Sequence, residues 1–479
     1  MTGDRSGGRP GSRRPAHRPP HEGAAADPIR LCAHRVLSAV ETDDAYANLA
    51  LPHALRDEGL TGRDAAFATE LVYGTLRLQG RYDAMIGATI EGRGVHALQP
   101  ALRIALRMGA HQIHAMRVPT RAAVYETVNL VKVVAGPAPV ALANAVLRRI
   151  ADRPLDEWED LIAAGPDGLA TWHSHPPWIV RAFRQSLALH GRPRDLVDLL
   201  EADNTPAAVT LVARPGLASR DDLAAHLPGA EPTPYSPYGL RLPGGLPGDV
   251  PGVAAGRVGV QDEGSQLMAL LAADAPIDGP DRSWLDMCAG PGGKTALLAA
   301  RARTRGAYVI ANEIAEHRAD LVRRAVRPLR DVVDVVLGDG RYIGEDNPGY
   351  FDRVLLDAPC TGLGSLRRRP ESRWRRTPDD VPDLTRLQRD LIDSAVGALR
   401  PGGLLCYVTC SPHPAETITQ VLDATRRHHL TVLDAPALLR PFGLDLETPP
   451  EAPVPGVAQL WPHLHGTDAM FGAVLRREG

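Results

Sequence analysis

The chain lacks several features that would place it in a membrane or outside the cell. Its longest apolar runs are far shorter than the roughly 18 residues of a membrane-spanning helix. The N-terminus carries arginines but not the apolar segment of a signal peptide. The five cysteines are an odd number, and no pair shows zinc-ligand spacing. We therefore expect a cytoplasmic thiol protein that binds neither metal nor membrane.

Lysine is almost absent, since only Lys132 and Lys294 occur beside many arginines. The net charge of −3 gives no overall signal for nucleic acid. Local charge does, because the segment 366–376 is rich in arginine around Trp374 and follows Cys360 closely. Such a run is often only a solvated surface, but the interleaved tryptophan favours a loop that contacts RNA phosphates. The candidate residues are Arg367, Arg368, Arg369, Arg373, Arg375 and Arg376.

Composition and periodicity divide the chain before its catalytic part. Residues 1–27 are rich in Arg, Gly and Pro with almost no large apolar residue, so we expect a disordered tail. Residues 28–152 show helical periodicity without strand alternation and predict an all-helical domain. Residues 153–250 are mixed, with a helix expected over 178–190 and a strand over 207–213. They predict a small mixed α/β connecting domain.

Strands and helices alternate over residues 251–479. Apolar runs predict strands at 284–288, 307–311, 332–337, 351–356 and 404–409. This alternation implies a parallel sheet with helices on both faces. Ligands of such sheets bind beyond the carboxyl ends of the strands. The residues with useful chemistry follow those ends: a glycine turn at 290–293, Glu313, Asp339, Asp357 with Cys360, and Cys410.

The glycine turn fits neither of two common phosphate-binding patterns. A Walker loop needs glycine at position 288, which is Cys288, and the dinucleotide pattern needs glycine at position 295, which is Thr295. A strand, a tight turn and a helix remain, which together can hold an adenosine cofactor. Glu313 can then accept hydrogen bonds from a ribose diol, and Asp339 can lie near an adenine edge.

Motifs spread along the chain from about Pro28 resemble one family closely. They occur at 64–74, 144–148, 260–266, 286–295, 357–364, 409–411 and 465–468. In this order they resemble the bacterial small-subunit (16S) ribosomal RNA cytosine-5 methyltransferases of family B, the Sun-type enzymes with a NusB-like N-terminal domain. Three places depart from the family pattern: Gly290 stands where alanine is usual, Glu313 where aspartate is common, and Ala469-Met470 where Gly-Phe is usual.

The resemblance implies an all-α NusB-like domain followed by an α/β Rossmann-like methyltransferase domain, acting as a monomer with small-subunit rRNA as its partner. It implies S-adenosylmethionine-dependent methylation of cytosine C5 through a covalent adduct. Cys410 would attack C6, Cys360 would help product release, and Asp357 would bind the polar edge of the cytosine. The cofactor would be held by Cys288, Ala289, Gly290, Pro291, Gly292, Gly293, Lys294, Glu313, Asp339 and Asp357.

Other functions remain open at this point. The substrate could be another RNA, such as tRNA. A DNA cytosine-5 methyltransferase would use Cys360 as its nucleophile, but the Thr409-Cys410-Ser411 motif and the helical domain argue against it. A non-catalytic RNA-binding factor would need a degenerate catalytic fold. The glycine turn, Asp357 and both cysteines are intact, which argues against that reading.

Overall fold

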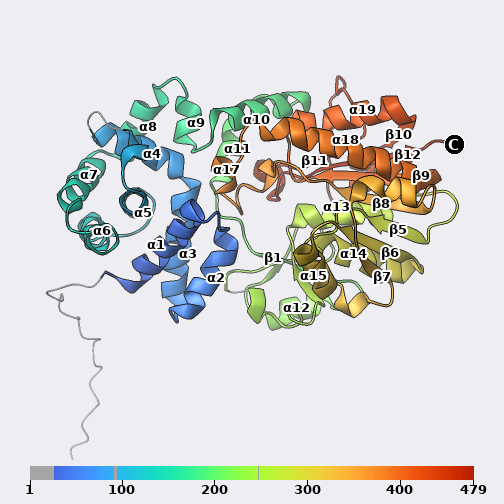
Figure 1. Cartoon of the computed structure of the whole chain (residues 1–479), viewed down its shortest axis with the longest axis horizontal. Coiled ribbons are helices and arrows are strands. Elements are labelled where there is room, and N and C mark those ends of the chain that lie inside the picture. Colours follow the sequence, from blue (N-terminus) through green and yellow to red (C-terminus); the bar gives the residue numbers. More distant parts are fainter. Residues whose placement is uncertain (1–25, 91–93, 246) are drawn as a thin grey trace, which may run out of the picture.

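The computed structural model describes residues 26–90, 94–245 and 247–479 (Figure 1). The tail expected at 1–27 falls outside these residues for all but its last two positions. Within the described ranges, no helix combines the length and the apolar character needed to cross a bilayer. The chain forms a helical part, a small sheet and a large α/β part.

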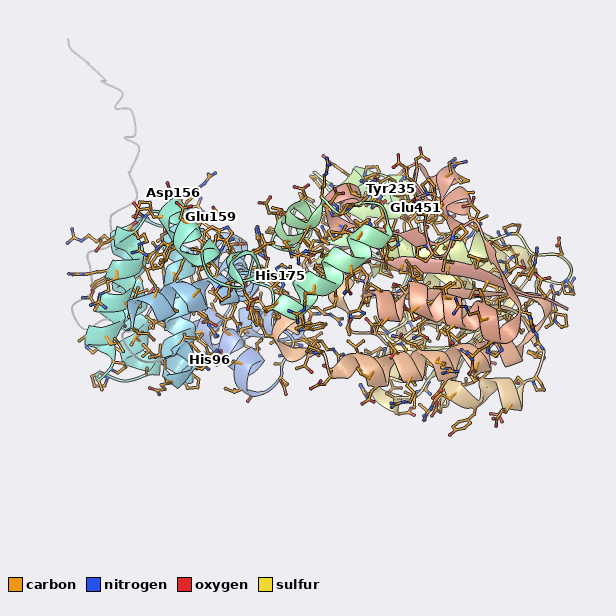
Figure 2. All side chains as sticks on the ribbon, turned by 90° about the horizontal axis from the view of Figure 1, so that it is seen from above. His96, Asp156, Glu159, His175, Tyr235 and Glu451 are labelled. Atoms are coloured by element: carbon orange, nitrogen blue, oxygen red, sulfur yellow. The ribbon has the colours of Figure 1, made fainter. Side chains whose placement is uncertain are left out.

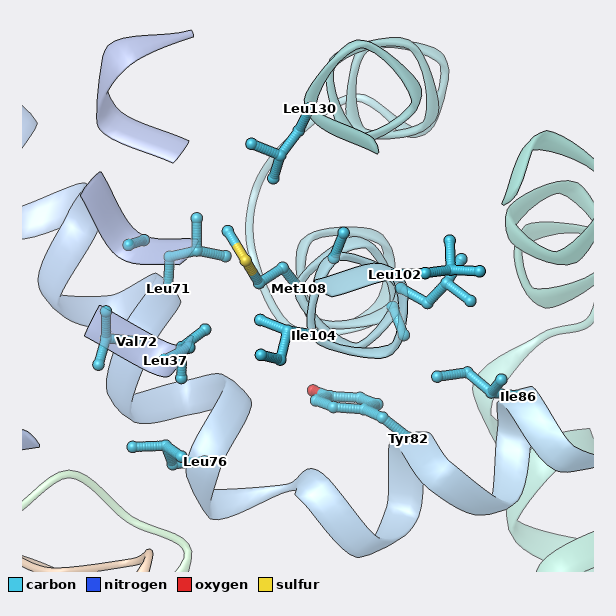
Figure 3. Packing of buried hydrophobic residues seen from close by; sticks show 14 of the residues in the cluster. Leu37, Leu71, Val72, Leu76, Tyr82, Ile86, Leu102, Ile104, Met108 and Leu130 are labelled. Carbon is cyan, nitrogen blue, oxygen red and sulfur yellow. The ribbon is translucent and has the colours of Figure 1, made fainter. Parts of the chain in front are cut away.

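The first part is all-helical, as the periodicity predicts. Its helices are α1 (Pro28–Thr42), α2 (Ala47–Asp57), α3 (Gly62–Arg77), α4 (Gln79–Thr89), α5 (Pro100–His114), α6 (Thr120–Val134) and α7 (Val140–Asp152). Asp27 caps α1 by accepting the Arg30 N–H, and Pro28 begins the helix, where a missing N–H costs nothing. The apolar stripe of α5 lies at the centre of this part. Figure 3 shows its buried Met108 between Leu71 of α3 and Leu130 of α6.

The middle of the chain contains more helices and a small antiparallel sheet. The helices are α8 (Leu155–Ala163), α9 (Gly168–Trp172), α10 (Pro177–Leu189), α11 (Leu196–Asp203) and α12 (Arg220–His226). The strands are β1 (Thr210–Ala213), β2 (Glu231–Pro232), β3 (Gly239–Arg241) and β4 (Val258–Val260), in the order β2-β3-β1-β4. The helix predicted at 178–190 is confirmed as α10. The strand predicted at 207–213 begins only at Thr210.

The last part is built on a larger sheet with the order β10-β12-β9-β8-β5-β6-β7. Its strands are β5 (Ser283–Asp286), β6 (Tyr308–Glu313), β7 (Val333–Leu337), β8 (Phe351–Asp357), β9 (Leu399–Thr409), β10 (Leu430–Leu433) and β12 (Phe471–Arg477), with β11 (Ala458–Gln459) beside β12. The strands β5 to β9 are parallel, as expected. The strands β10 and β12 add an antiparallel edge to the sheet, which the apolar runs of the sequence did not predict.

Helices cover both faces of this sheet. In Figure 1, α18 (Asp380–Ala398) and α19 (Ile418–His428) lie on one side, while α13 (Glu263–Asp274), α14 (Gly293–Arg305) and α15 (Glu316–Ala325) lie on the other. Two separate apolar clusters fill the two layers. Burial on both faces explains why these strands are continuous apolar runs in the sequence. It also leaves the carboxyl edge of the sheet as the place where polar side chains gather.

Candidate active site

The central strands bring four distant segments of the sequence to one edge. In the sheet β5 lies between β6 and β8, and β9 follows β8. Their last residues are Asp286, Glu313, Asp357 and Thr409. Parallel strands end at the same edge. The glycine turn, the acidic residues and both cysteines predicted for the site therefore share one region.

The glycine turn links β5 to α14 and is shaped by Gly292. This residue has φ +102°, a left-handed conformation that favours glycine, and a Cβ there would lie 2.8 Å from the Cβ of Ala325. The helix α14 begins at the next residue, Gly293. Its first N–H groups and positive dipole end face the edge of the sheet. The turn therefore offers donors to a polar ligand, as its sequence indicated.

Glu313 holds the turn in place from the end of β6. Its carboxylate accepts the N–H of Gly290 and the N–H of Ala315, each at 3.0 Å, and it is 3 % exposed. Arg318 donates to the carbonyl oxygen of Gly290 at 2.6 Å. A Cβ on Gly290 would lie 2.2 Å from Glu313 Oε2. The two departures from the family pattern, Gly290 and Glu313, therefore depend on each other. The longer glutamate side chain occupies the space that the methyl group of an alanine at 290 would need.

Two further acidic residues at this edge, Asp339 and Asp286, differ in their surroundings. Asp339 follows β7 as predicted, but its carboxylate is paired with Arg341 at 2.6 Å, which holds its pKa below the ordinary value. Asp286 was not predicted as a site residue. It is buried at the end of β5 and accepts a hydrogen bond from Thr295 at 2.7 Å. Burial raises the pKa of Asp286 to about 7. An acidic residue closing a core strand is the signal that could have found it.

The two candidate cysteines meet at the ends of β8 and β9. The sulfur atoms of Cys360 and Cys410 are 3.4 Å apart, and both thiols are part-buried. The hydrogen bond between the two thiols lowers the pKa of Cys410, and the nearby ammonium of Lys294 acts in the same direction. The same hydrogen bond, with burial, raises the pKa of Cys360. The pair therefore favours a thiolate on Cys410, the form needed in a nucleophile.

Lys294 extends from the glycine turn towards the end of β8. Its Nζ donates to Asp357 Oδ2 at 2.8 Å. Burial disfavours the ammonium, but Asp357 outweighs it and raises the pKa of Lys294. The cation stays charged and fixes the Asp357 carboxylate beside the two thiols. The remaining cysteines are Cys32, Cys288 and Cys406, and burial raises the pKa of each of them, which favours the protonated thiol.

A buried polar network, which no sequence motif predicted, supports the loops of both cysteines. Glu416 accepts the N–H of Thr361 at 2.8 Å and its hydroxyl at 2.6 Å. The hydroxyls of Thr361 and Ser411 are 3.0 Å apart, and Gln388 donates to Glu416. Thr361 follows Cys360, and Ser411 follows Cys410. The network thus fixes the spacing of the two sulfur atoms. Its members are far apart in sequence, so only the fold reveals it.

The arginine run was expected to form an RNA-contacting loop, and for several of its residues this is corrected. Arg373 is completely buried in the short helix α17 (Ser372–Arg375). Its guanidinium donates to four acceptors at 2.7–3.1 Å, which are the carbonyl oxygens of Arg77, Ser174 and Asp203 and the side chain of Asn204. Arg375 donates to the carbonyl oxygens of Val40 and Ala45. These side chains join the helical part to the catalytic part.

Arg367 and Arg368 are also used internally. Arg367 is 8 % exposed and donates to the carbonyl oxygen of Gly466, while Arg368 pairs with Asp262 and Asp468. Arg369 is exposed and Arg376 is half-buried, so these two remain candidates for RNA contact. Figure 1 shows α17 between the helical and α/β parts, and Figure 2 shows His175 at the same junction. The run is mainly a structural joint, because internal carbonyl oxygens and carboxylates take up its charges.

Comparisons with known proteins agree with this geometry. Residues 275–476 match the family described as 16S rRNA methyltransferase RsmB/F, and residues 27–152 match the NusB family. A protein of Mycobacterium tuberculosis named "Putative methyltransferase Rv1407" is 48 % identical over 456 residues, which cover 94 % of this chain and 97 % of that protein. The ribosomal RNA small subunit methyltransferase B of Vibrio cholerae is 35 % identical, with 78 % of this chain and 83 % of that protein covered.

Solved structures share the fold. The crystal structure of PH0851 covers 95 % of this chain and 100 % of that chain at a TM-score of 0.75 and 22 % identity. NSun6 from Pyrococcus horikoshii with SFG covers 62 % of this chain and 97 % of that chain at a TM-score of 0.51 and 19 % identity. The matched family depends on S-adenosylmethionine, so this is the cofactor of the protein. The chain belongs to the RsmB/F family of RNA cytosine-5 methyltransferases and carries a NusB-family domain at its N-terminal side.

Proposed function

We propose that this protein methylates C5 of a cytosine in small-subunit (16S) rRNA, with Cys410 as the nucleophile and Cys360 as the residue for product release. The observation that carries the proposal is the pair of thiols 3.4 Å apart, beside the ion pair of Lys294 and Asp357. We further propose that residues 28–152 bind RNA and that residues 251–479 carry out the reaction. Residues 153–250 would connect these two domains. The name and match of the Vibrio cholerae relative support the choice of rRNA.

The proposed chemistry needs each of these side chains at a definite atom. The Cys410 thiolate adds to C6 of the cytosine, and the electron pair of the C5–C6 double bond makes C5 nucleophilic. Bound S-adenosylmethionine supplies the methyl group. Asp357, held by Lys294, accepts a hydrogen bond from the amino group of the base. After Cys360 has released its own proton to solvent, its thiolate removes the C5 proton, the double bond re-forms, and the C6–sulfur bond breaks to return the Cys410 thiolate.

The residues present fit this cofactor. The glycine turn offers backbone donors at the start of α14, and Gly293 has no atom closer than 3.7 Å to a Cβ placed on it, which leaves room there. Each oxygen of the Glu313 carboxylate accepts one backbone N–H and keeps a second lone pair. Those lone pairs can accept hydrogen bonds from the two hydroxyls of a ribose. The turn would hold the charged end of the cofactor, and Glu313 its ribose.

Replacing Glu313 with glutamine should weaken cofactor binding. Glutamine keeps the size of the side chain but loses the charge and one acceptor oxygen. A charge-assisted hydrogen bond contributes roughly 1.5–3 kcal/mol, so we expect about a ten- to hundredfold rise in the Kd for S-adenosylmethionine. Isothermal titration calorimetry measures it directly. Asp334→Asn, on the outer strand β7, is the matched control. An unchanged Kd for Glu313→Gln would remove Glu313 from the cofactor site.

The substrate is tested by mapping cytosine methylation in a strain that lacks the gene. Bisulfite sequencing of rRNA and tRNA should show one small-subunit rRNA cytosine that loses its methyl group. Expressing the wild-type protein should restore it, and expressing Cys410→Ala should not. Loss of a tRNA methyl group instead would reassign the substrate within RNA. No change in either RNA would contradict the proposed function.

A further inference from the structure

A cavity of about 220 Å³ lies where the small sheet meets the loops of the catalytic part. That volume is many times the roughly 10–15 Å³ in which one water can be placed. Its walls include Thr233 and Arg241 from the small sheet, Asp262 and Glu263 from the start of α13, and Arg367 and Arg368 from the arginine run. The cavity is therefore polar and large enough for part of a nucleotide.

A short chain of hydrogen bonds connects this cavity to the nucleophile. Asp262 accepts the N–H of Asp468 at 3.0 Å. The N–H of the next residue, Ala469, donates to the carbonyl oxygen of Gly364 at 2.8 Å, and the N–H of Gly364 donates to the carbonyl oxygen of Cys410 at 2.8 Å. The cavity wall and the nucleophile loop are thus held in register.

The charges in the wall leave Arg241 available for a ligand. Asp262 is paired with Arg368, and the Glu263 carboxylate accepts the N–H groups of Tyr235 and Ser236, each at 2.7 Å. Arg241 is exposed on β3 and lines the cavity. Glu231 lies opposite it on β2, but among the described residues no carboxylate oxygen is within 4.0 Å of its guanidinium.

Two buried groups of the wall are also incompletely bonded. Arg367 Nε and the Thr233 hydroxyl have no hydrogen-bond partner, although both residues are more than nine-tenths buried. Buried polar groups are normally paired. These two atoms are covered by protein, and the Thr233 hydroxyl packs against Gly239. The exposed guanidinium of Arg241 is therefore the group of the wall that can take an anionic ligand.

We propose that this cavity binds one nucleotide of the RNA chain next to the target cytosine, with its phosphate on Arg241. The inference rests on the proposed function, because an RNA chain must continue on both sides of a cytosine that reaches Cys410. A phosphodiester would be an anionic partner for the Arg241 guanidinium, and a ribose would offer hydroxyl groups to the polar wall. The cavity would favour RNA segments in which a nucleotide next to the reacting cytosine can reach Arg241.

The test uses the full chain and an rRNA fragment that carries the mapped cytosine. Arg241→Gln should raise KM for this fragment about tenfold, the cost of one charge-assisted hydrogen bond. The loss should fall on KM rather than kcat, because the contact is made before and during the reaction. The slope of log K against log salt should become shallower by about 0.7, the value for one phosphate contact on a single strand.

Arg282→Gln is the matched control. Arg282 is also exposed, but it precedes β5 and lies at the opposite edge of the sheet. It should leave both KM and the salt slope unchanged. In a second arm, the phosphates beside the cytosine are replaced one at a time by neutral methylphosphonates. One replacement should weaken binding to the wild type and have no further effect on Arg241→Gln.

The outcomes separate this inference from the proposed function. If the wild type methylates the fragment and Arg241→Gln has the same KM and salt slope, the cavity does not bind the RNA chain. If every phosphate replacement weakens the wild type and the variant equally, Arg241 does not contact a neighbouring phosphate, and the inference is wrong. If the wild type transfers no methyl group to RNA at all, the proposed function itself fails.

Discussion

Replacing Cys410 with alanine should abolish methylation and every covalent protein–RNA species. Loss of a catalytic nucleophile commonly costs on the order of 10⁴-fold or more in kcat. Replacing Cys360 with alanine should have a different effect. Cys410 can still attack C6 and C5 can still take the methyl group, but the adduct cannot eliminate. We expect a slow band on a denaturing gel that carries labelled methyl groups and disappears with nuclease treatment.

Cys32→Ala is the control, because Cys32 is a buried cysteine of the helical part, away from the site. It should turn over normally and accumulate no adduct. The two sulfur atoms are 3.4 Å apart, so position alone does not separate their roles. The Thr409-Cys410-Ser411 motif, together with the lowered pKa of Cys410, is what favours this assignment. An adduct that accumulates in Cys410→Ala and is absent in Cys360→Ala would reverse it.

Replacing Arg373 with methionine should destabilise the protein severely. Methionine fills similar space without the guanidinium, so four buried acceptors from Arg77, Ser174, Asp203 and Asn204 lose their donor. Leaving buried partners unpaired in this way costs about 3–5 kcal/mol. Chemical denaturation followed by circular dichroism should show the loss. Limited proteolysis should cut between the helical and catalytic parts, because Arg373 connects them.

Arg376→Met is the matched control in the same loop. Its guanidinium is 3.8 Å from Asp380 and its side chain is 39 % exposed, so its ion pair is a surface one. Such pairs contribute roughly 0–1 kcal/mol. Equal losses in the two variants would show that Arg373 is not a structural joint. A normal unfolding curve for Arg373→Met, together with a shallower salt dependence of RNA binding, would restore the original interpretation of the run as an RNA-contacting loop.

Several features followed from the sequence alone because they depend on local patterns. Helical periodicity predicted the all-helical part, and the alternation of apolar runs with helices predicted the parallel sheet. Parallel strands end at one edge of a sheet, and this rule predicted that Glu313, Asp357 and Cys410 lie at one site although they are far apart in the chain. The antiparallel edge made by β12 was missed, because no local pattern states which strand pairs with which.

The tertiary structure decided what each polar side chain contacts. A run of arginines looks alike whether it faces solvent or protein, and only the packing of α17 against the helical part shows that Arg373 is buried. The same holds for Glu416, which lies in no motif yet fixes the loop of Cys360 through Thr361. Local sequence sets which groups a segment carries. Whether a charged side chain is solvated, paired or buried depends on residues hundreds of positions away in the sequence. Only the tertiary structure brings those residues into contact with it.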